Sequence, residues 1–271
     1  MEKEVQTDVT KNIENIETQR IEPTQLEVVQ NDALTIEEIE TGLVYNGSMV
    51  RVADISEEFR KVIEPILRMY NAAMNVTTAR IEIIKDESRY KNVRCPVHHI
   101  DTRLKSAGSI LGKLQKKNLD LTIGAACNNI YDIAGVRIVC PYIKDVYFIR
   151  DRILAQDDIE VMKVKDYIEH PKENGYRSYH LIIRVPVFFM NKKQMVPVEI
   201  QIRTMAMDLW ASLEHDISYK AINSKGEYQG DYSEFREELT ECSRLIYEAE
   251  EKMERMNSML CLLYTSPSPR D

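Results

Sequence analysis

Apolar side chains recur at helical spacing from about Asp54, after a long stretch that shows no such pattern. Residues 1–47 are acidic, poor in aromatic side chains and rich in Glu, Gln, Thr and Asn, so they bury too little area to offset their ordering entropy. We expect this segment to be an acidic tail that is flexible or weakly helical. The helix that starts near Asp54 is expected to be kinked or restarted at Pro65, and a second helical stretch follows to about Tyr90. Its first apolar face consists of Phe59, Val62, Ile63, Ile66, Leu67 and Tyr70.

A third helix is predicted from roughly Asp101 to Lys117, and it has two different faces. One face is apolar and is expected to pack on the core, through Ala107, Leu111 and Leu114. The other face carries hydroxyl and cationic groups about one turn apart, namely Arg103, Lys105, Ser109, Lys113 and Lys116. This polar face is either a solvated lysine surface or one wall of a groove that binds anions.

Period-two alternation predicts strands between residues 136 and 203. One strand starts near Val136, directly after Gly135, and a second apolar strand spans Leu181–Phe189. In the segment Val196–Arg203 apolar and polar side chains alternate and therefore lie on opposite faces. The apolar positions are Val198, Ile200 and Ile202, and the polar positions are Glu199, Gln201 and Arg203. The polar face is either the solvated side of an edge strand or, in a central strand, the lining of a cleft.

The rest of the chain returns to helical periodicity. Thr204–Lys220 is predicted to be an amphipathic helix whose apolar side covers the sheet, with Met205, Leu209, Trp210, Leu213 and Ile217 as packing residues. Ser233–Leu260 is predicted to be a helix with an apolar stripe at near-heptad spacing, which packs either within the chain or between subunits. Residues 261–271 break this pattern and resemble translated sequencing-adapter sequence, so we expect a non-native extension. The alternative is a natural flexible tail.

Composition narrows the classes of function. The chain has 271 residues and a formal net charge of -8, which argues against a globally basic nucleic-acid-binding protein. A local cationic cleft remains compatible with this charge. The five cysteines show no Cys-x-x-Cys spacing, and their odd number favours reduced thiols in a cytoplasmic protein. No apolar run is long enough to span a membrane, so no membrane partner is expected.

Residues 171–180 carry many binding groups between two predicted strands. Lys172 supplies a cation, and Asn174 supplies an amide that both donates and accepts hydrogen bonds. Tyr176 offers a flat ring for stacking, and His180 a donor that titrates near neutrality. Together these groups suit a phosphorylated, planar ligand.

Asp132 lies just before the predicted strand at Val136. On its own it is either a cap or turn residue or a ligand for a hard divalent cation such as Mg²⁺. Glu199 offers the partner carboxylate that such a cation requires.

Several ordered motifs together resemble the small alarmone synthetases, which are single-domain relatives of the synthetase half of bacterial stringent-response enzymes. The resemblance covers about residues 95–220, and ordered motifs at sensible spacing are far more specific than any single motif. The motifs are Arg103-x-Lys105, Asp132-Ile-Ala-Gly-Val-Arg137, Lys165-Asp-Tyr-Ile-x-x-Pro-Lys-x-Asn-Gly-Tyr176 with His180, Val198-Glu-Ile-Gln-Ile-Arg203, and Trp210-Ala211.

The resemblance implies an α+β fold, a nucleotidyltransferase-like mixed β-sheet flanked by helices, with helical N- and C-terminal extensions. It implies a synthetase domain over residues 48–222 and a helical oligomerisation segment over residues 223–260, with a homotetramer as the family's assembly. The implied reaction transfers the β,γ-diphosphate of ATP to the 3′-hydroxyl of GTP or GDP. It makes (p)ppGpp alarmones for the stringent response and releases AMP. Because the chain has no room for the hydrolase domain of the longer enzymes, synthesis without hydrolysis is expected.

The resemblance also implies residue roles. Asp132 and Glu199 are expected to bind Mg²⁺, with Glu199 also activating the 3′-hydroxyl. For ATP, Arg103 and Arg137 are expected to stack on the two sides of the adenine, and the phosphate contacts are Lys105, Ser109, Lys113 and Lys165. Lys116 and Lys163 occupy places where family members often carry arginine, so they are further ATP contacts without bidentate geometry. For the acceptor, Tyr176 is expected to stack on guanine, Asn174 and Ala211 to recognise it, and Lys172, His180 and Gln201 to bind phosphate or ribose.

Two other functions stay open at this stage. The first is a toxin-like pyrophosphokinase that acts on tRNA 3′ ends, which a basic surface beyond the cleft would favour. The second is a non-catalytic regulator that binds guanine nucleotides or RNA, which the loss of Asp132 or Glu199 would favour. Both carboxylates are present. Regulation of an active enzyme by an alarmone or by RNA also remains open.

Overall fold

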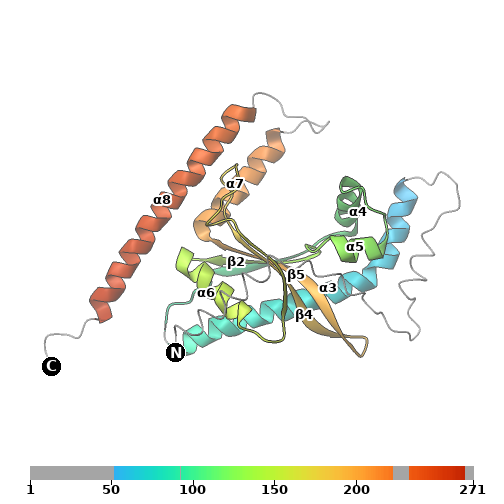
Figure 1. The fold of residues 1–271 in the computed structure, drawn as a ribbon, viewed down its shortest axis with the longest axis horizontal. Helices are drawn as coiled ribbons and strands as arrows, with labels where there is room; N and C mark the ends of the chain where they lie inside the picture. Colours follow the sequence, from blue (N-terminus) through green and yellow to red (C-terminus); the bar gives the residue numbers. More distant parts are fainter. Residues whose placement is uncertain (1–51, 92, 222–231, 266–271) are drawn as a thin grey trace.

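The computed structural model describes residues 52–91, 93–221 and 232–265. The acidic tail predicted for residues 1–47 lies outside the described residues. In chain order the described elements are α3 (Val52–Tyr90), β1 (His99–Leu104), α4 (Ala107–Lys116), α5 (Ile123–Asn129), β2 (Ala134–Cys140), α6 (Ile143–Leu154), β3 (Glu160–Asp166), β4 (Tyr179–Phe189), β5 (Lys192–Thr204), α7 (Met205–Ala221) and α8 (Tyr232–Thr265). Figure 1 shows their arrangement.

The strands form one mixed sheet in the order β1-β2-β5-β4-β3. Strands β2 and β5 are parallel, and every other neighbouring pair is antiparallel. The predicted α+β architecture, a mixed sheet flanked by helices, is therefore confirmed. Strand β5 has a partner on both sides, so its polar face is not the outer side of an edge strand.

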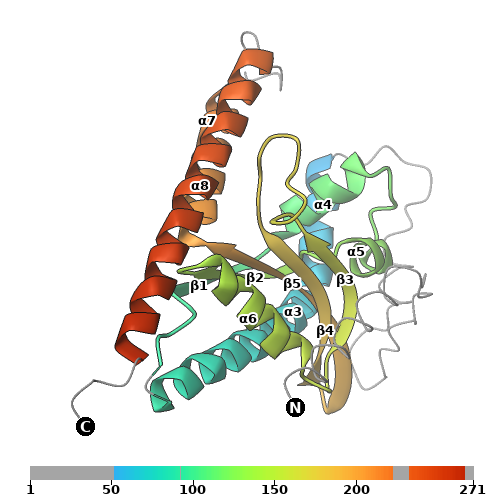
Figure 2. The ribbon, with the colours of Figure 1, turned by 60° about the vertical axis from the view of Figure 1, so that its left-hand side comes forward.

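The core lies on one face of the sheet. Val198, Ile200 and Ile202 of β5 are fully buried, in the alternation that the sequence predicts. They belong to one hydrophobic cluster with residues of α3 and α6, such as Tyr70 and Ile149. Figure 2 shows both helices running along the sheet. The opposite face of the sheet is therefore available for polar side chains.

Helix α3 is continuous through Pro65, so the expectation of a helix restarted at this residue and a separate second helix is wrong. Proline removes one backbone hydrogen bond and crowds the preceding turn, which costs about 3 kcal/mol. The buried stripe continues on both sides of it, with Ile63, Tyr70 and Ile81 each 1% exposed or less. Burying such side chains contributes about 1.5–3 kcal/mol each, which outweighs the local cost.

The predicted helix over Asp101–Lys117 is wrong for its first six residues. His99–Leu104 forms β1, which pairs with β2 alone, and α4 begins only at Ala107 after the N-cap residue Ser106. Edge pairing leaves the middle of β1 exposed, so the segment shows no alternation of apolar residues from which a strand could be predicted. The apolar face of α4 is confirmed, since Ala107, Leu111 and Leu114 are buried.

The two C-terminal helices lie next to each other (Figure 1). In α7, Trp210 is buried and its indole N–H donates to the Leu239 carbonyl of α8 at 3.0 Å. In contrast, Met205, Leu209 and Leu213 are each about half exposed, so the expectation that they pack on the sheet is wrong. Helix α8 runs to Thr265, beyond the predicted end at Leu260, and the non-native origin of residues 261–271 stays a prediction.

The cysteines of the described residues are free thiols, as expected, with Cys127 and Cys140 buried and Cys242 exposed. In the same part of the chain, no helix has the length and apolar character needed to span a membrane.

Candidate active site

Strand pairing arranges the predicted site residues in two rows across the polar face of the sheet. Side chains of directly paired residues project from the same face, so each row is a line of neighbours. The first row is Lys163, Ile182, Glu199, Gly135 and Arg103, and the second is Lys165, His180, Gln201, Arg137 and Asp101. The register of the sheet therefore brings together residues that are far apart in the sequence.

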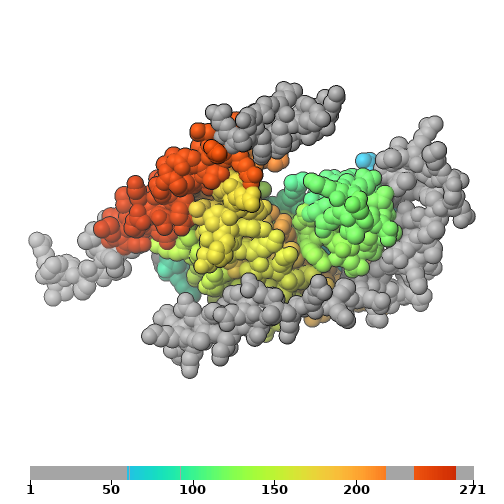
Figure 3. Space-filling view, turned by 45° about the horizontal axis from the view of Figure 1, so that its top comes forward, coloured from blue at the N-terminus to red at the C-terminus, as the bar shows by residue number. Residues whose placement is uncertain are grey.

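A cavity of about 300 Å³ lies above these rows. Figure 3 shows a hollow between the green segment that contains α4 and α5 and the yellow segment around β3 and the start of β4. Six of the predicted site residues line the cavity: Lys113, Asp132, Lys163, Lys165, His180 and Glu199. Two carboxylates thus share one cavity with several cations.

Asp132 is paired with two lysines. Its Oδ2 atom accepts a hydrogen bond from Lys113 Nζ at 2.7 Å and lies 3.1 Å from Lys105 Nζ. Lys105 is placed by its own backbone, because its N–H donates to the Ile133 carbonyl at 2.8 Å. Burial by itself would raise the pKa of Asp132, but the hydrogen bonds and charges of Lys113 and Lys105 outweigh it and lower this pKa. Asp132 is therefore an ionised carboxylate at neutral pH.

The second oxygen of Asp132 is suited to a cation. Oδ1 is buried and has no hydrogen-bond partner among the described residues. A buried carboxylate oxygen without a partner is costly, and Mg²⁺ prefers oxygen ligands of this kind. Among the described residues no cluster of three or more His, Cys, Asp or Glu side chains forms a complete metal site. The unpartnered Oδ1 atom of Asp132 fits a Mg²⁺ ion as one oxygen ligand.

Glu199 has a polar partner at each of its oxygens. Its Oε1 atom lies 3.5 Å from His180 Nδ1, and Gln201 Nε2 donates to Oε2 at 3.0 Å. Burial and the negative charge of Asp132 act to raise the pKa of Glu199, but contacts with His180 and Gln201 outweigh them and lower it. Glu199 is thus a second ionised carboxylate, and its surroundings differ from those of Asp132.

The loop before β4 places Tyr176 beside His180. Gly175 has a φ of +86°, a conformation that favours glycine, and the backbone N–H of Tyr176 donates to Asn174 Oδ1 at 3.2 Å. The Tyr176 hydroxyl lies 2.8 Å from His180 Nε2. Lys172 Nζ lies 4.6 Å from the centroid of the Tyr176 ring. The loop therefore presents an aromatic ring and a cation at one end of the polar face.

The other predicted residues are not part of the cavity lining. Arg103 is exposed on β1, and Lys116 and Ser109 are exposed on α4, where Ser109 contacts the capping hydroxyl of Ser106. Lys172 and Asn174 border a separate surface depression. The remaining three predicted residues outside the lining are Arg137 of β2, Gln201 of β5 and Ala211 of α7. The structure does not place all of these residues around a single cavity.

Three polar residues line the cavity without having been predicted: Lys117, Asn129 and Tyr131. Lys117 Nζ donates to the Asn129 carbonyl at 2.9 Å. A signal for Lys117 is present in the sequence, because it follows Lys113 by four residues, which places the two on one side of a helix. No comparable pattern identifies Asn129.

Known proteins share this fold and sequence. Residues 102–224 match the region found in RelA/SpoT proteins. The GTP pyrophosphokinase YwaC of Bacillus subtilis is 41% identical over 187 residues, which cover 69% of this chain and 86% of YwaC. The B. subtilis GTP pyrophosphokinase YjbM is 35% identical over 157 residues, covering 58% of this chain and 73% of YjbM.

Solved structures agree with the sequence matches. Small alarmone synthetase 1 of B. subtilis, bound to its product pppGpp, superimposes with a TM-score of 0.65 at 28% identity, over 76% of this chain and 99% of that one. Small alarmone synthetase 2 of B. subtilis gives a TM-score of 0.62 at 39% identity, over 71% and 96%. The chain belongs to the RelA/SpoT family. Within that family it is a small alarmone synthetase, as its motifs predict.

Proposed function

We propose that this chain is a GTP pyrophosphokinase, which transfers the β,γ-diphosphate of ATP to the 3′-hydroxyl of GTP or GDP. The observation that carries this proposal is the cavity in which Asp132 and Glu199 lie among cationic side chains. Two ionised carboxylates with lysines around them suit a reaction that binds phosphates, neutralises their charge and activates a hydroxyl. The printed names of the relatives support the same activity.

Glu199 is the general base in this proposal. Its carboxylate removes the proton of the ribose 3′-hydroxyl as that oxygen attacks the β-phosphorus of ATP. The bond between the β-phosphorus and the oxygen that links it to the α-phosphate breaks, and AMP leaves. The hydrogen bond from Gln201 and the contact with His180 orient the two oxygens of the base.

The lysines around the cavity bind the phosphates of ATP. Lys113, Lys163 and Lys165 line the cavity, and Lys105 reaches it through its contact with Asp132. Their charges compensate the negative charge that builds up during transfer. We propose Ser109 and Lys116 as outer phosphate contacts, and Arg103 and Arg137 as the pair that stacks on the adenine, since a guanidinium plane stacks well on a base.

Mg²⁺ is the proposed cofactor. When bound, this ion would neutralise part of the negative charge of the phosphates. Asp132, through its unpartnered Oδ1 atom, and Glu199 are the oxygen ligands that we propose for it. Lys113 and Lys105, which pair with the other oxygen of Asp132, would then also contact the phosphates.

The loop before β4 and the second row of the sheet bind the acceptor in this proposal. The ring of Tyr176 stacks on guanine, and Asn174 and Ala211 contribute to its recognition. The guanine would exchange places with the ammonium of Lys172 on the Tyr176 ring, so that Lys172 contacts the acceptor phosphates. His180 and Gln201 contact phosphate or ribose while they orient Glu199.

We further propose that the chain self-associates. The expected assembly is the homotetramer that the family resemblance implies. The half-exposed stripe on α7, formed by Met205, Leu209 and Leu213, supports an interface, since an apolar stripe of this kind favours contact with another surface. We also propose a cytoplasmic location, where both nucleotides occur.

Incubation of the purified protein with ATP, Mg²⁺ and either GTP or GDP tests this proposal, with products separated by anion exchange. The expected products are a 3′-diphosphorylated guanosine nucleotide and AMP in equal amounts, both absent with Asp132→Asn. Unchanged nucleotides from a folded, nucleotide-binding protein would contradict the proposal. A parallel reaction uses tRNA as the acceptor. Diphosphate transfer to tRNA would indicate the tRNA-directed activity, and no transfer to either acceptor would indicate a regulator without catalysis.

A further inference from the structure

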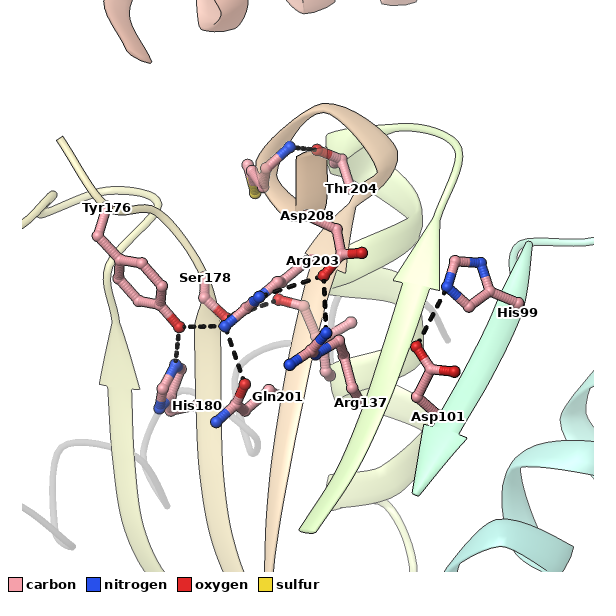
Figure 4. Close-up of polar contacts among 12 residues, drawn as sticks. His99, Asp101, Arg137, Tyr176, Ser178, His180, Gln201, Arg203, Thr204 and Asp208 are labelled. Carbon is pink, nitrogen blue, oxygen red and sulfur yellow. Dashed lines mark hydrogen bonds and ion pairs between the residues drawn. The ribbon is translucent and has the colours of Figure 1, made fainter. Parts of the chain in front are cut away.

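Arg203 is the most extensively hydrogen-bonded residue of the polar face, and the proposed mechanism gives it no role. Its side chain is 7% exposed. Its guanidinium donates from Nη2 to the Tyr176 hydroxyl at 2.6 Å and to Gln201 Oε1 at 2.9 Å. It also donates from Nε to Ser178 Oγ at 3.4 Å and from Nη1 to Asp208 Oδ1 at 3.2 Å. Figure 4 shows these contacts.

The first chain of hydrogen bonds from Arg203 passes through Tyr176 and His180. A guanidinium has donors only, so the Tyr176 oxygen accepts from it and the Tyr176 O–H is left to donate. The acceptor for that proton is His180 Nε2, at 2.8 Å. With Nε2 accepting, a neutral imidazole carries its proton on Nδ1, which is the atom that faces Glu199 Oε1 at 3.5 Å.

The second chain passes through Gln201. Its Oε1 atom accepts from Arg203, so the amide nitrogen at the other side of the group faces Glu199. That nitrogen donates to Glu199 Oε2 at 3.0 Å. The two chains therefore start at one nitrogen of Arg203 and end on the two oxygens of the same carboxylate.

We propose that Arg203 is a positioning residue for Glu199, because it fixes the tautomer of His180 and the amide orientation of Gln201 so that both donate to the Glu199 carboxylate. This inference rests on the proposed function, in which Glu199 is the base. Without a donor-only group at position 203, Tyr176 and Gln201 can reverse their hydrogen bonds. The reversed arrangement presents an acceptor to Glu199 in place of a donor.

Asp208 links this arrangement to the proposed ATP-binding side of the site. The Oδ1 atom that accepts from Arg203 also lies 3.3 Å from Arg137 Nη1, and Arg137 is the proposed adenine contact of β2. A buried arginine needs such a partner to offset its desolvation. Asp208 therefore places Arg203 and Arg137 relative to each other, and the two halves of the site share one carboxylate.

Kinetic measurements on Arg203→Gln and Arg203→Lys test the proposal. Glutamine both donates and accepts, so it cannot fix the direction of the two chains, and we expect kcat to fall roughly 10- to 100-fold, as for other residues that orient a catalytic carboxylate. KM for ATP should change by less than about threefold. Lysine has donors only and should restore part of kcat. Arg184→Lys is the matched control, because Arg184 lies on β4 and pairs with Glu160, outside the cavity lining, and should leave kcat unchanged.

The ring ¹⁵N shifts of His180 provide a measurement that does not depend on turnover. We expect the Nδ1–H tautomer in the wild-type protein and a mixture of tautomers in Arg203→Gln. Tyr176→Phe interrupts the first chain without leaving a buried charge unpaired, and it should give the same mixture of tautomers. This variant therefore provides the test if Arg203→Gln fails to fold.

A folded Arg203→Gln protein with wild-type kcat, or with His180 still in the Nδ1–H tautomer, would overturn the proposal. If the wild-type protein transfers no diphosphate, the proposed function fails, and the His180 tautomer alone then decides the role of Arg203.

Discussion

Glu199 and Asp132 are carboxylates of the same cavity with different surroundings, and this difference supports the separate roles that we propose for them. Asp132 faces two ammonium groups and has one oxygen without a partner among the described residues. Glu199 instead accepts a hydrogen bond from Gln201 at one oxygen, and its other oxygen faces His180 Nδ1 at 3.5 Å. The first arrangement suits a ligand for a cation, and the second suits an oriented base.

Replacing Glu199 by glutamine tests this assignment. The change keeps the shape of the side chain and removes its basicity, so we expect diphosphate transfer to fall by about 10²- to 10⁴-fold. Nucleotide affinity, measured by calorimetry with a non-hydrolysable ATP analogue, should stay within a fewfold. Glu160→Gln, a change at a half-exposed position of β3, serves as a control. Turnover of Glu199→Gln at the wild-type rate would remove this residue from the mechanism.

Gly175 is a second position at which one residue determines local geometry. A Cβ atom there would lie 2.7 Å from Ser243 Cβ of α8, and the φ of +86° is unfavourable for other residues. We expect Gly175→Ala to destabilise the protein by about 1–3 kcal/mol and to raise KM for GDP, because the displaced loop carries Tyr176. Thermal melting and steady-state kinetics measure both effects.

Gly112→Ala is the matched control for this change. It lies in α4 with no heavy atom within 4 Å of the added Cβ, so it should be neutral or stabilising. Equal losses of stability in the two variants would show that the contact with Ser243 is not the cause.

At the scale of elements, α8 packs directly on the acceptor loop as well as on α7. Ser243 Oγ donates to the Gly175 carbonyl at 2.5 Å, and Arg177 stacks on the Tyr247 ring at 4.0 Å from its centroid. Glu250 lies nearby and is 6% exposed, with Oε2 unpartnered among the described residues. Helix α8 therefore supports the loop that carries Tyr176, in addition to any role between subunits.

The contact between α8 and the domain should weaken as the pH rises. Burial, together with the charge of Glu254, raises the pKa of Glu250 to about 7, against the lowering effects of Thr204 and Arg177. Because the folded-state pKa lies above the unfolded value, the stabilisation is complete below the unfolded pKa and is lost as the pH rises through about 7. The expected loss is on the order of 3 kcal/mol.

Glu250→Gln should remove this dependence, since glutamine does not ionise. Hydrogen exchange of the α8 amides, corrected for intrinsic rates, should increase between pH 6 and 8 in the wild-type protein and not in the variant. Equal pH dependence in the two proteins would exclude Glu250 as its source.

The strands also show which parts of the fold could be predicted from the sequence. Strands β4 and β5 are predictable because their apolar residues alternate, and β5 then places Glu199 and Gln201 opposite the core. Strand β1 is not predictable in this way, because it pairs on one side only and its side chains are largely exposed. The spacing of Lys105, Ser109 and Lys113 instead suggests a helix, although Lys105 precedes α4.

The hydrogen-bond chains from Arg203 could not be predicted from the sequence. Alternation places Arg203 and Gln201 on one face, but the partners of Arg203 depend on the register of β4 and on where α7 begins. Asp208 becomes a partner only because α7 starts directly after Thr204. Long-range geometry of this kind leaves no local pattern in the sequence.

For the whole molecule, the exposed apolar residues of α7 and α8 predict self-association. Leu209 and Leu213 are separated by one helical turn and are 56% and 51% exposed. In Leu213→Glu we expect the assembly to dissociate toward the 31.5 kDa monomer without loss of secondary structure, because a charge would be buried in the interface. Light scattering coupled to size exclusion measures this change.

Ser212→Glu introduces the same charge at an adjacent exposed position and should not affect the assembly. A wild-type protein that is already monomeric would contradict the self-association proposal.

The two faces of β5 also limit how genes of this family can change in length. Inserting or deleting one codon between residues 196 and 204 would turn the following side chains to the other face, moving Ile200 or Ile202 into the cavity and burying Glu199 or Gln201. A substitution in β5 can have a small or a large effect on the site, whereas a change in length disrupts the core and the site together. We expect tolerated length variation at the β4–β5 turn, where Met190 and Asn191 already have positive φ angles and Met190 is 64% exposed.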